Sequence, residues 1–185
     1  EDVRADEVAA KYVRKFVGAR ELLHNKERWC LWLVDLDPAD ISRSPVLRER
    51  LNRVRNFRTN SSSPDAQAAA ATPHLFWWRS HPGVDYLCIP SVVSENRRYF
   101  TAERLPADTI TSNAAFTAPD PDGLLFALIS SSMFIVWQKA IGGRLESRLR
   151  FSGTLSWNTF PVPTLDVAKR QQIINAGKDV LQARA

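Results

Sequence analysis

The chain has 185 residues, of which 44% are hydrophobic, so it can bury a core of its own and is not a disordered segment. Its net charge of +5 comes mostly from arginine, whose planar fork pairs with phosphate or guanine, and this favours nucleic acid over an acidic protein as the partner. No signal peptide and no apolar run of membrane-spanning length occurs, so we expect a soluble protein, and its two unpaired cysteines fit a reducing cytoplasm.

The first 34 residues predict a helix followed by a strand. Asp6 is placed to cap a helix that runs to about Phe16, with Gly18 as its C-terminal stop. The apolar, aromatic run 28–34 then predicts a buried strand. The chain opens inside a charged, helix-like stretch without Met, so we expect it to be a piece of a longer protein.

An arginine-rich helix is predicted next. Ser44 followed by Pro45 is typical of a helix start, and apolar residues at helical spacing continue to about Arg58. Its polar face is typical of a solvated helix, and the functional alternative is contact with phosphates through Arg55 and Arg58. An alanine-rich helical turn is predicted over 65–71.

The middle of the chain predicts strands. Residues 75–78 and 86–90 are expected to pair as a hairpin through a turn at 81–83. A further strand is predicted over 110–116, where Asn113 has the amide needed to bond adenine, although a lone Asn is more typical of a turn or cap.

A long apolar helix is predicted over 124–140, capped by an Asp and stopped by Gly142 and Gly143. Because it is apolar nearly all round, it belongs in a core and can hold the next segment rigidly. A final amphipathic helix is predicted over 167–183.

The segment after the apolar helix has the chemistry of a DNA-reading strand. Arg144, Glu146, Arg148 and Arg150 recur with period two and would share one face of an extended strand, while Leu149 anchors it. A carboxylate among guanidiniums can distinguish base edges in a major groove. A solvated, salt-bridged strand surface explains the same pattern equally well.

Motifs for catalysis or cofactor binding are not recognisable in the sequence. There is no Walker loop, GxGxxG, HExxH or CxxC, so we expect neither a metal site nor catalysis in this chain. Cys30 and Cys88 lie in apolar runs and are predicted to be buried free thiols. The carboxylate pairs border prolines at element ends, where capping explains them better than acid/base work.

Several runs, in the same order along most of the chain, resemble the target recognition domain of single-chain restriction-modification enzymes of the MmeI kind. These runs are YVRKFVG (12–18), ERWCLWL (27–33), TPHLF (72–76), IP (89–90), SENRRY (94–99), SN (112–113), GRLESRLRFS (143–152) and NTFP (158–161).

The resemblance implies an α+β fold, with a mixed or antiparallel sheet packed with helices, similar to the recognition domains of type I specificity subunits. It implies a recognition domain over 1–164, with 165–185 leading into a C-terminal helical region. The parent enzyme would join it to an adenine-N6 methyltransferase using S-adenosylmethionine and to a Mg²⁺-dependent nuclease. The methyltransferase's Asn/Asp-Pro-Pro-Tyr/Phe motif is absent here, so this part is expected to bind double-stranded DNA without modifying it.

The resemblance also implies residue roles. In that family the segment matching Glu146 and Arg148 reads one base pair, and a carboxylate followed by a guanidinium suits C·G. The remaining base-reading candidates are Ser147, Arg150, Asn113, Ala114 and Ser91, and the backbone-contacting candidates are Arg97, Arg98, Arg144, Arg55 and Arg58. The alternatives are a basic protein-interaction domain and an RNA or single-strand binder using exposed Trp residues.

Overall fold

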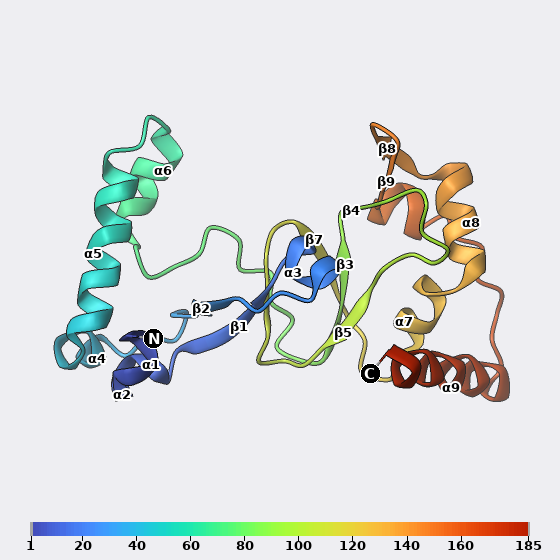
Figure 1. Ribbon diagram of the computed structural model, residues 1–185, viewed down its shortest axis with the longest axis horizontal. Coiled ribbons are helices and arrows are strands. Elements are labelled where there is room, and N and C mark those ends of the chain that lie inside the picture. Colours follow the sequence, from blue (N-terminus) through green and yellow to red (C-terminus); the bar gives the residue numbers. More distant parts are fainter. Residues whose placement is uncertain (1, 185) are drawn as a thin grey trace. The chain divides into compact units, whose positions relative to one another are not determined.

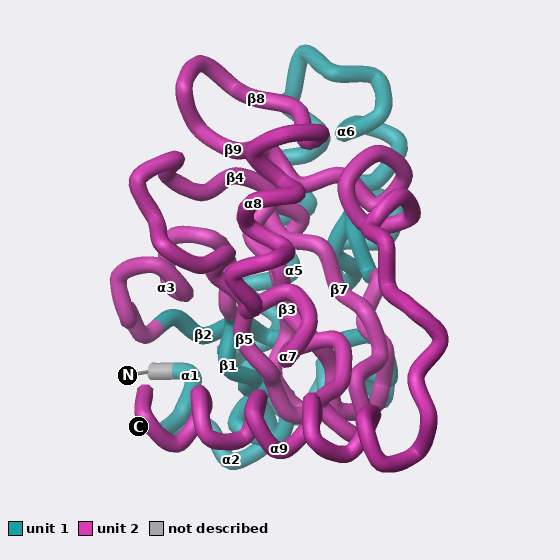
Figure 2. Tube along the Cα trace, turned by 90° about the vertical axis from the view of Figure 1, so that its right-hand side faces the viewer, with its two compact units in different colours: residues 1–16, 28–79 teal, residues 17–27, 80–185 magenta. Residues whose placement is uncertain are grey.

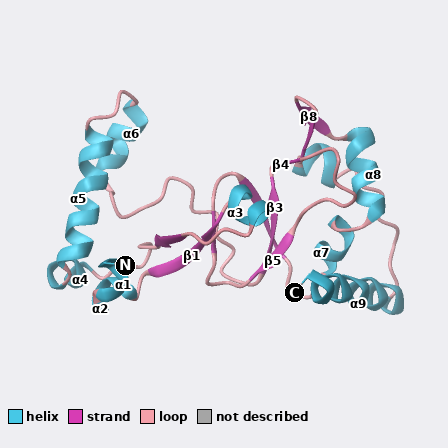
Figure 3. Cartoon of the chain, in the orientation of Figure 1, coloured by secondary structure: helices cyan, strands magenta, loops and turns pink. Residues whose placement is uncertain are grey.

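The computed structural model describes residues 2–184, which form two compact units. Unit 1 comprises the chain up to Phe16 together with Arg28–Arg79, and unit 2 comprises Val17–Glu27 together with the chain from Ser80 onwards (Figure 2). Both mix helices with short antiparallel strands, which confirms the predicted α+β class (Figure 3). None of the helices in the described part is long and apolar enough to cross a bilayer.

Unit 1 is mainly helical and has a small apolar core. Its core residues are Ala9, Leu33, Leu47 and Leu51. The elements are α1 (Asp2–Ala5), α2 (Glu7–Ala10), β1 (Val13–Val17, entering unit 2 at Val17), β2 (Trp29–Leu31), α4 (Pro38–Arg43), α5 (Pro45–Thr59), α6 (Pro64–Ala68) and the 3₁₀ turn η1 (Ala69–Ala71) (Figure 1).

The helix starts in unit 1 follow from side-chain capping. Asp6 accepts hydrogen bonds from the backbone N–H groups of Val8 and Ala9, at 3.0 and 2.8 Å. Ser44 Oγ accepts from Leu47 N at 3.0 Å and donates to Asp6 Oδ2 at 2.7 Å, so the two caps support one another. The predicted start of the arginine-rich helix at Pro45 is confirmed.

The helix predicted from Asp6 to about Phe16 is wrong beyond Ala10. Residues Val13–Val17 form strand β1 instead, and Val13–Lys15 pair antiparallel with Trp29–Leu31 of β2. Pairing with a distant segment overrides the apolar spacing that favoured a helix. Gly18 precedes the next helix rather than ending this one, and β2 is only partly buried, with Trp29 46% exposed.

Unit 2 contains most of the strands and the larger core. Strand β3 (Tyr86–Pro90) is buried along its whole length and pairs antiparallel with β5 (Glu103–Leu105) and β7 (Ala115–Pro119). The other elements are α3 (Ala19–His24), β4 (Val92–Val93), β6 (Ile110–Thr111), α7 (Leu124–Ile129), α8 (Ser132–Ile141), β8 (Gly143–Leu145), β9 (Arg148–Arg150), the π-helical turn η2 (Gly153–Trp157) and α9 (Val167–Arg184).

Three predictions for the middle of the chain are corrected. Residues 75–78 form no strand, so the predicted hairpin with 86–90 is wrong, and β3 takes β5 and β7 as partners. The strand predicted over 110–116 is divided into β6 and β7 by a turn at Asn113 and Ala114. The apolar helix is divided into α7 and α8 at Ser130 and Ser131, because Ser131 Oγ caps a new helix by accepting from Phe134 N at 3.1 Å.

Helices α7, α8 and α9 cover the main core of unit 2. Phe126, Phe134, Leu149 and Phe151 are buried in it. Helix α9 packs closely against α7, since a Cβ added at Gly177 would lie 2.7 Å from Cβ of Ala127. The predicted final helix is therefore confirmed as an element, and it packs within unit 2.

The start of α7 is fixed by a buried carboxylate. Asp120 is 1% exposed and accepts from the backbone N–H groups of Leu125 and Phe126, both at 3.1 Å. Arg104 lies beside it, with Nε 3.6 Å from Oδ2 and Nη2 donating to the Asp120 carbonyl at 2.8 Å. The carboxylate thus joins a strand, a loop and a helix.

The two cysteines are free thiols, as predicted, but only Cys88 is fully buried, whereas Cys30 is partly exposed. Burial raises the pKa of Cys88 to about 12 and that of Cys30 to about 11, so both stay protonated at neutral pH.

Candidate nucleic-acid interface

The predicted reading segment is a β-hairpin. Strands β8 and β9 pair antiparallel with Leu145 opposite Arg148, which leaves Glu146 and Ser147 as a two-residue turn (Figure 1). The prediction of one extended strand with alternate side chains on a single face is therefore wrong. Glu146 has a φ of 57°, in the left-handed region that non-glycine residues seldom adopt.

The hairpin side chains are exposed and engaged with one another. Arg148 Nη2 donates to Glu146 Oε2 at 2.8 Å, with exposed side-chain fractions of 48% and 76%. Arg144 Nη1 donates to the Ser147 carbonyl at 3.0 Å and to Glu95 Oε2 at 3.1 Å. The carboxylate of Glu146 and the guanidinium of Arg148 are thus adjacent at the turn and accessible to solvent.

The structure brings three segments with predicted reading residues together through backbone hydrogen bonds. Ser91 N donates to the Ala114 carbonyl at 3.1 Å, and the Ser91 carbonyl accepts from Phe151 N at 2.9 Å. Strand β4 continues the connection, because Val92 pairs with Arg150 of β9. Ser91, Ala114 and Arg150 are therefore neighbours although they lie far apart in the sequence.

Asn113 lies in the turn that begins this connection. It is exposed, and next to it Ser112 Oγ accepts from Ala114 N at 3.3 Å. The turn-forming interpretation of this Asn thus fits its position in the turn.

Gln138 binds the backbone of the hairpin strand β9, a supporting role that the sequence did not predict. It is fully buried in α8, and its Nε2 donates to the Arg150 carbonyl at 2.9 Å. A side chain at Gly142 would collide with this amide, so glycine is needed there. The sequence signal is weak: Gln138 is an uncharged amide that follows a run of apolar residues in the helix.

The loop between β4 and β5 carries Glu95, Arg97 and Arg98. Glu95 was also missed, since an acidic residue in a loop carries no distinctive sequence signal. The side chains of Arg97 and Arg98 are exposed, and neither makes a hydrogen bond or ion pair with another described residue. They border an open pocket of about 780 Å³ that Glu103 and Arg184 also line. Their guanidiniums are thus available for an anion.

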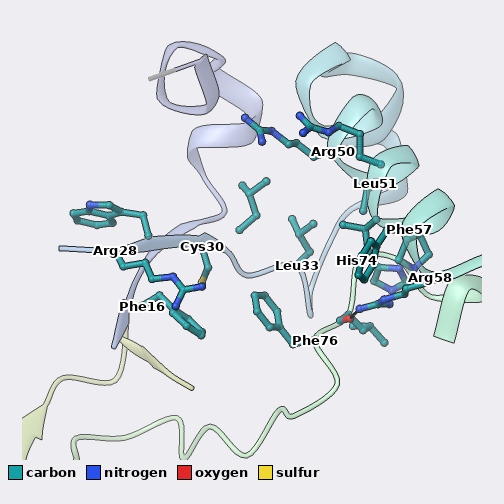
Figure 4. Close-up of a pocket in the computed structure, with 16 residues that line it drawn as sticks. Phe16, Arg28, Cys30, Leu33, Arg50, Leu51, Phe57, Arg58, His74 and Phe76 are labelled. Atoms are coloured by element: carbon teal, nitrogen blue, oxygen red, sulfur yellow. Dashed lines mark hydrogen bonds between the residues drawn. The ribbon is translucent and has the colours of Figure 1, made fainter. Parts of the chain in front are cut away.

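Arg55 and Arg58 belong to unit 1 and have different surroundings. Arg58 donates to the carbonyls of Ala69, Thr72 and Leu75 at 2.9, 2.9 and 2.7 Å, beside a groove of about 690 Å³ with Phe76 in its wall (Figure 4). Arg55 is exposed and bonds only to Asn52 Oδ1, at 3.4 Å, among the described residues. Arg58 therefore fastens the loop after η1, whereas Arg55 projects into solvent.

Replacing Arg58 by Ala is expected to lower the free energy of unfolding of unit 1 by about 1–3 kcal/mol, because three carbonyls lose a charged donor. Hydrogen exchange of the amides in unit 1 measures this loss. Arg55→Ala is the matched control and should change the value by less than about 0.5 kcal/mol. Equal losses in the two variants would contradict the clamping role of Arg58.

Within residues 2–184, no group of three or more His, Cys, Asp and Glu residues is arranged to hold a metal ion. The chemistry of the site is instead that of hydrogen-bond donors and acceptors on an exposed hairpin. Such a surface recognises a polar, anionic ligand by geometry and charge.

Comparisons with known proteins agree with this geometry. The family model described as "MmeI, target recognition domain" matches residues 1–164. DNA methyltransferase A of Bacillus subtilis (strain 168) is 34% identical over 174 residues, which cover 94% of this chain and 20% of that protein. The solved structure of the Type IIL restriction-modification enzyme MmeI in complex with DNA matches 99% of this chain and 24% of its own, with 38% identity and a TM-score of 0.89. The chain thus spans a quarter or less of either relative.

Proposed function

Because this chain belongs to the MmeI target recognition domain family, we propose that it binds duplex DNA and reads a specific sequence through its major groove. The β8–β9 hairpin enters the groove, and the neighbouring turn at Asn113 and Ala114 follows it. The exposed Glu146–Arg148 pair carries the proposal.

The chemistry of that pair suits one C·G base pair. In the major groove cytosine presents an N4 donor, and guanine beside it presents the O6 and N7 acceptors. Glu146 supplies an acceptor and Arg148 a fork of donors, and their charged groups are only 2.8 Å apart. One side chain can therefore contact each base of the same pair, with Glu146 accepting from cytosine and Arg148 donating to guanine.

The other residues have supporting roles. Ser147, Arg150, Asn113, Ala114 and Ser91 lie on or beside the hairpin and read adjacent positions. Arg97 and Arg98 are the strongest candidates for phosphate contacts, since no other described residue occupies their guanidiniums. Arg55 is exposed and remains a weaker phosphate candidate. The three carbonyl partners of Arg58 make its phosphate contact the least favoured of the set.

The parent protein is proposed to be a cytoplasmic restriction-modification enzyme. This chain would direct an adenine-N6 methyltransferase domain of the same polypeptide, together with a nuclease, to its site on DNA. S-adenosylmethionine and Mg²⁺ would be bound by those domains. The support is the similarity to DNA methyltransferase A and to MmeI.

The test begins with the sequence that the intact enzyme methylates. A duplex with that sequence is expected to bind more tightly than a scrambled duplex, with an affinity that falls with salt by a slope of roughly −0.9 per phosphate neutralised. Titrations at several salt concentrations measure both effects. Equal affinity for the scrambled duplex, or tighter binding of single strands with Trp quenching, would overturn the proposal.

A further inference from the structure

We infer that Arg144 is a positioning residue for base reading: together with Glu95 it holds the turn that carries Glu146, instead of gripping a phosphate. The inference rests on the proposed function, because it concerns how the reading pair is held. It differs from the phosphate contact that the sequence suggests for this arginine.

The contacts of Arg144 join two separate segments. Its Nη1 carries two hydrogens, and the atom lies 3.0 Å from the Ser147 carbonyl and 3.1 Å from Glu95 Oε2. Ser147 belongs to the hairpin turn, whereas Glu95 lies 49 residues earlier in the loop after β4. A single guanidinium nitrogen therefore connects the turn of the hairpin to a second loop.

The sequence of the turn, Glu146-Ser147, lacks the residues that normally stabilise a two-residue hairpin turn. The favoured two-residue hairpin turns need a positive φ at one or both central residues, which is why Gly, Asn and Asp are preferred there. Here Glu146 adopts a φ of 57°, a backbone conformation that is unfavourable for a residue with a side chain. The direction of the Glu146 carboxylate depends on this backbone, so a hydrogen bond to the next carbonyl helps to set the direction of the reading group.

The same contacts make Arg144 a poor phosphate ligand. Its charge is already balanced by Glu95, and a phosphate placed beside it would meet that carboxylate at close range. Arg97 and Arg98 lie in the same loop and have no such partner among the described residues. In this loop, Arg97 and Arg98 are thus available for phosphate contacts, whereas Glu95 binds Arg144 of the hairpin.

The expected effect is modest, because both partners are partly exposed, with side-chain fractions of 44% and 42%. Exposed ion pairs contribute at most about 1 kcal/mol, so losing this one should reduce discrimination about two- to five-fold. The loss should concern the base pair read by Glu146 and Arg148. General affinity for DNA should change much less.

The experiment uses the intact enzyme with Arg144→Ala, Glu95→Gln and the double variant. Binding is measured to the duplex with the methylated site and to a duplex in which the pair read by Glu146 and Arg148 is reversed. Each single variant should lose discrimination, and the double variant should lose no more than either. The salt slope should stay unchanged, and Arg144→Lys should restore most of the discrimination because it keeps donors and charge.

Arg97→Ala is the control for a phosphate contact. It should lower the salt slope by roughly 0.9 and keep the discrimination. The inference is overturned if Arg144→Ala behaves like Arg97→Ala, or if Glu95→Gln leaves discrimination intact. The double variant Glu146→Lys, Arg148→Asp distinguishes a failure of the proposed function from a failure of the inference about Arg144. If it leaves the preferred base unchanged, both fail. If it changes the preference while the Arg144 and Glu95 variants do not, only the inference fails.

Discussion

Exchanging Glu146 for Lys and Arg148 for Asp in the intact enzyme is expected to change the preferred base pair from C·G to G·C at one position of the site. Lys donates to guanine and Asp accepts from the cytosine opposite, so each side chain exchanges its partner. With each pair contributing about 1–3 kcal/mol, the preference should reverse by one to two orders of magnitude or more. Both side chains are exposed, so the fold should be unaffected.

The sequence of the methylated sites measures this change directly. Each single variant should lose activity on both sites, because it presents two groups of the same kind to a pair that needs one donor and one acceptor. The matched control is Glu49→Lys with Arg53→Asp, which reverses an exposed ion pair on α5 whose groups lie 3.7 Å apart. The control should leave the methylated site as it was. An unchanged site in the hairpin variant would contradict the assignment of the reading pair.

Replacing Asp120 by Ala is expected to lower the free energy of unfolding by about 3–5 kcal/mol, because the change leaves the Arg104 charge without its buried partner. Two backbone N–H groups at the start of α7 lose their acceptor as well. Since α7 leads into α8, whose Gln138 holds Arg150, DNA discrimination should weaken with stability. Urea unfolding measures the loss.

Asp122→Ala is the control for this second change. Asp122 also accepts a backbone N–H at the same helix start, from Leu124 at 3.1 Å, and pairs with Arg170 at 2.6 Å. Its side chain is 39% exposed, so water replaces much of what is lost and the cost should be about 1 kcal/mol. Similar losses in the two variants would show that burial is not what makes Asp120 important.

The elements that could be predicted from the sequence are those whose signals are local. Helix α5 has a Ser cap, a Pro in its first turn and apolar residues at helical spacing, and all of these act within the helix itself. At the start of α7 the hydrogen bond from Leu124 N to Asp122 Oδ1 is likewise local. Caps and periodicity predict such elements because the stabilising partners are only a few residues away.

The errors lie where distant partners decide the structure. Val13–Val17 carries apolar residues that suit a helix and a strand alike, and pairing with β2 decides between them. The hairpin shows the same limit, because a period of two fits one long strand as well as two short ones. Its turn contains Glu and Ser rather than Asn-Gly, so no turn residue marked it.

For the candidate site, the sequence indicated the residue types but not their support. The chemistry of Arg148 and Glu146, together with the family resemblance, indicates a reading pair, and the structure places their charged groups in contact. Glu95 and Gln138 were missed because an exposed acid and a lone amide gain meaning only from what lies opposite them. Ser91 pairs with Ala114 and Phe151 through backbone atoms alone, so the identities of the side chains do not predict this pairing.

That backbone connection has an evolutionary consequence. The bonds between Ser91, Ala114 and Phe151, and from Gln138 to the Arg150 carbonyl, use main-chain atoms of the segments that we propose to read DNA. Every residue except proline offers the same N–H and carbonyl groups, so substitutions at the exposed positions Ala114 and Arg150 can change the outward side chains without removing these hydrogen bonds. We therefore expect proteins that share these backbone hydrogen bonds to differ in the DNA sequence they recognise. A few substitutions should suffice for this, and the intermediate variants should remain stable.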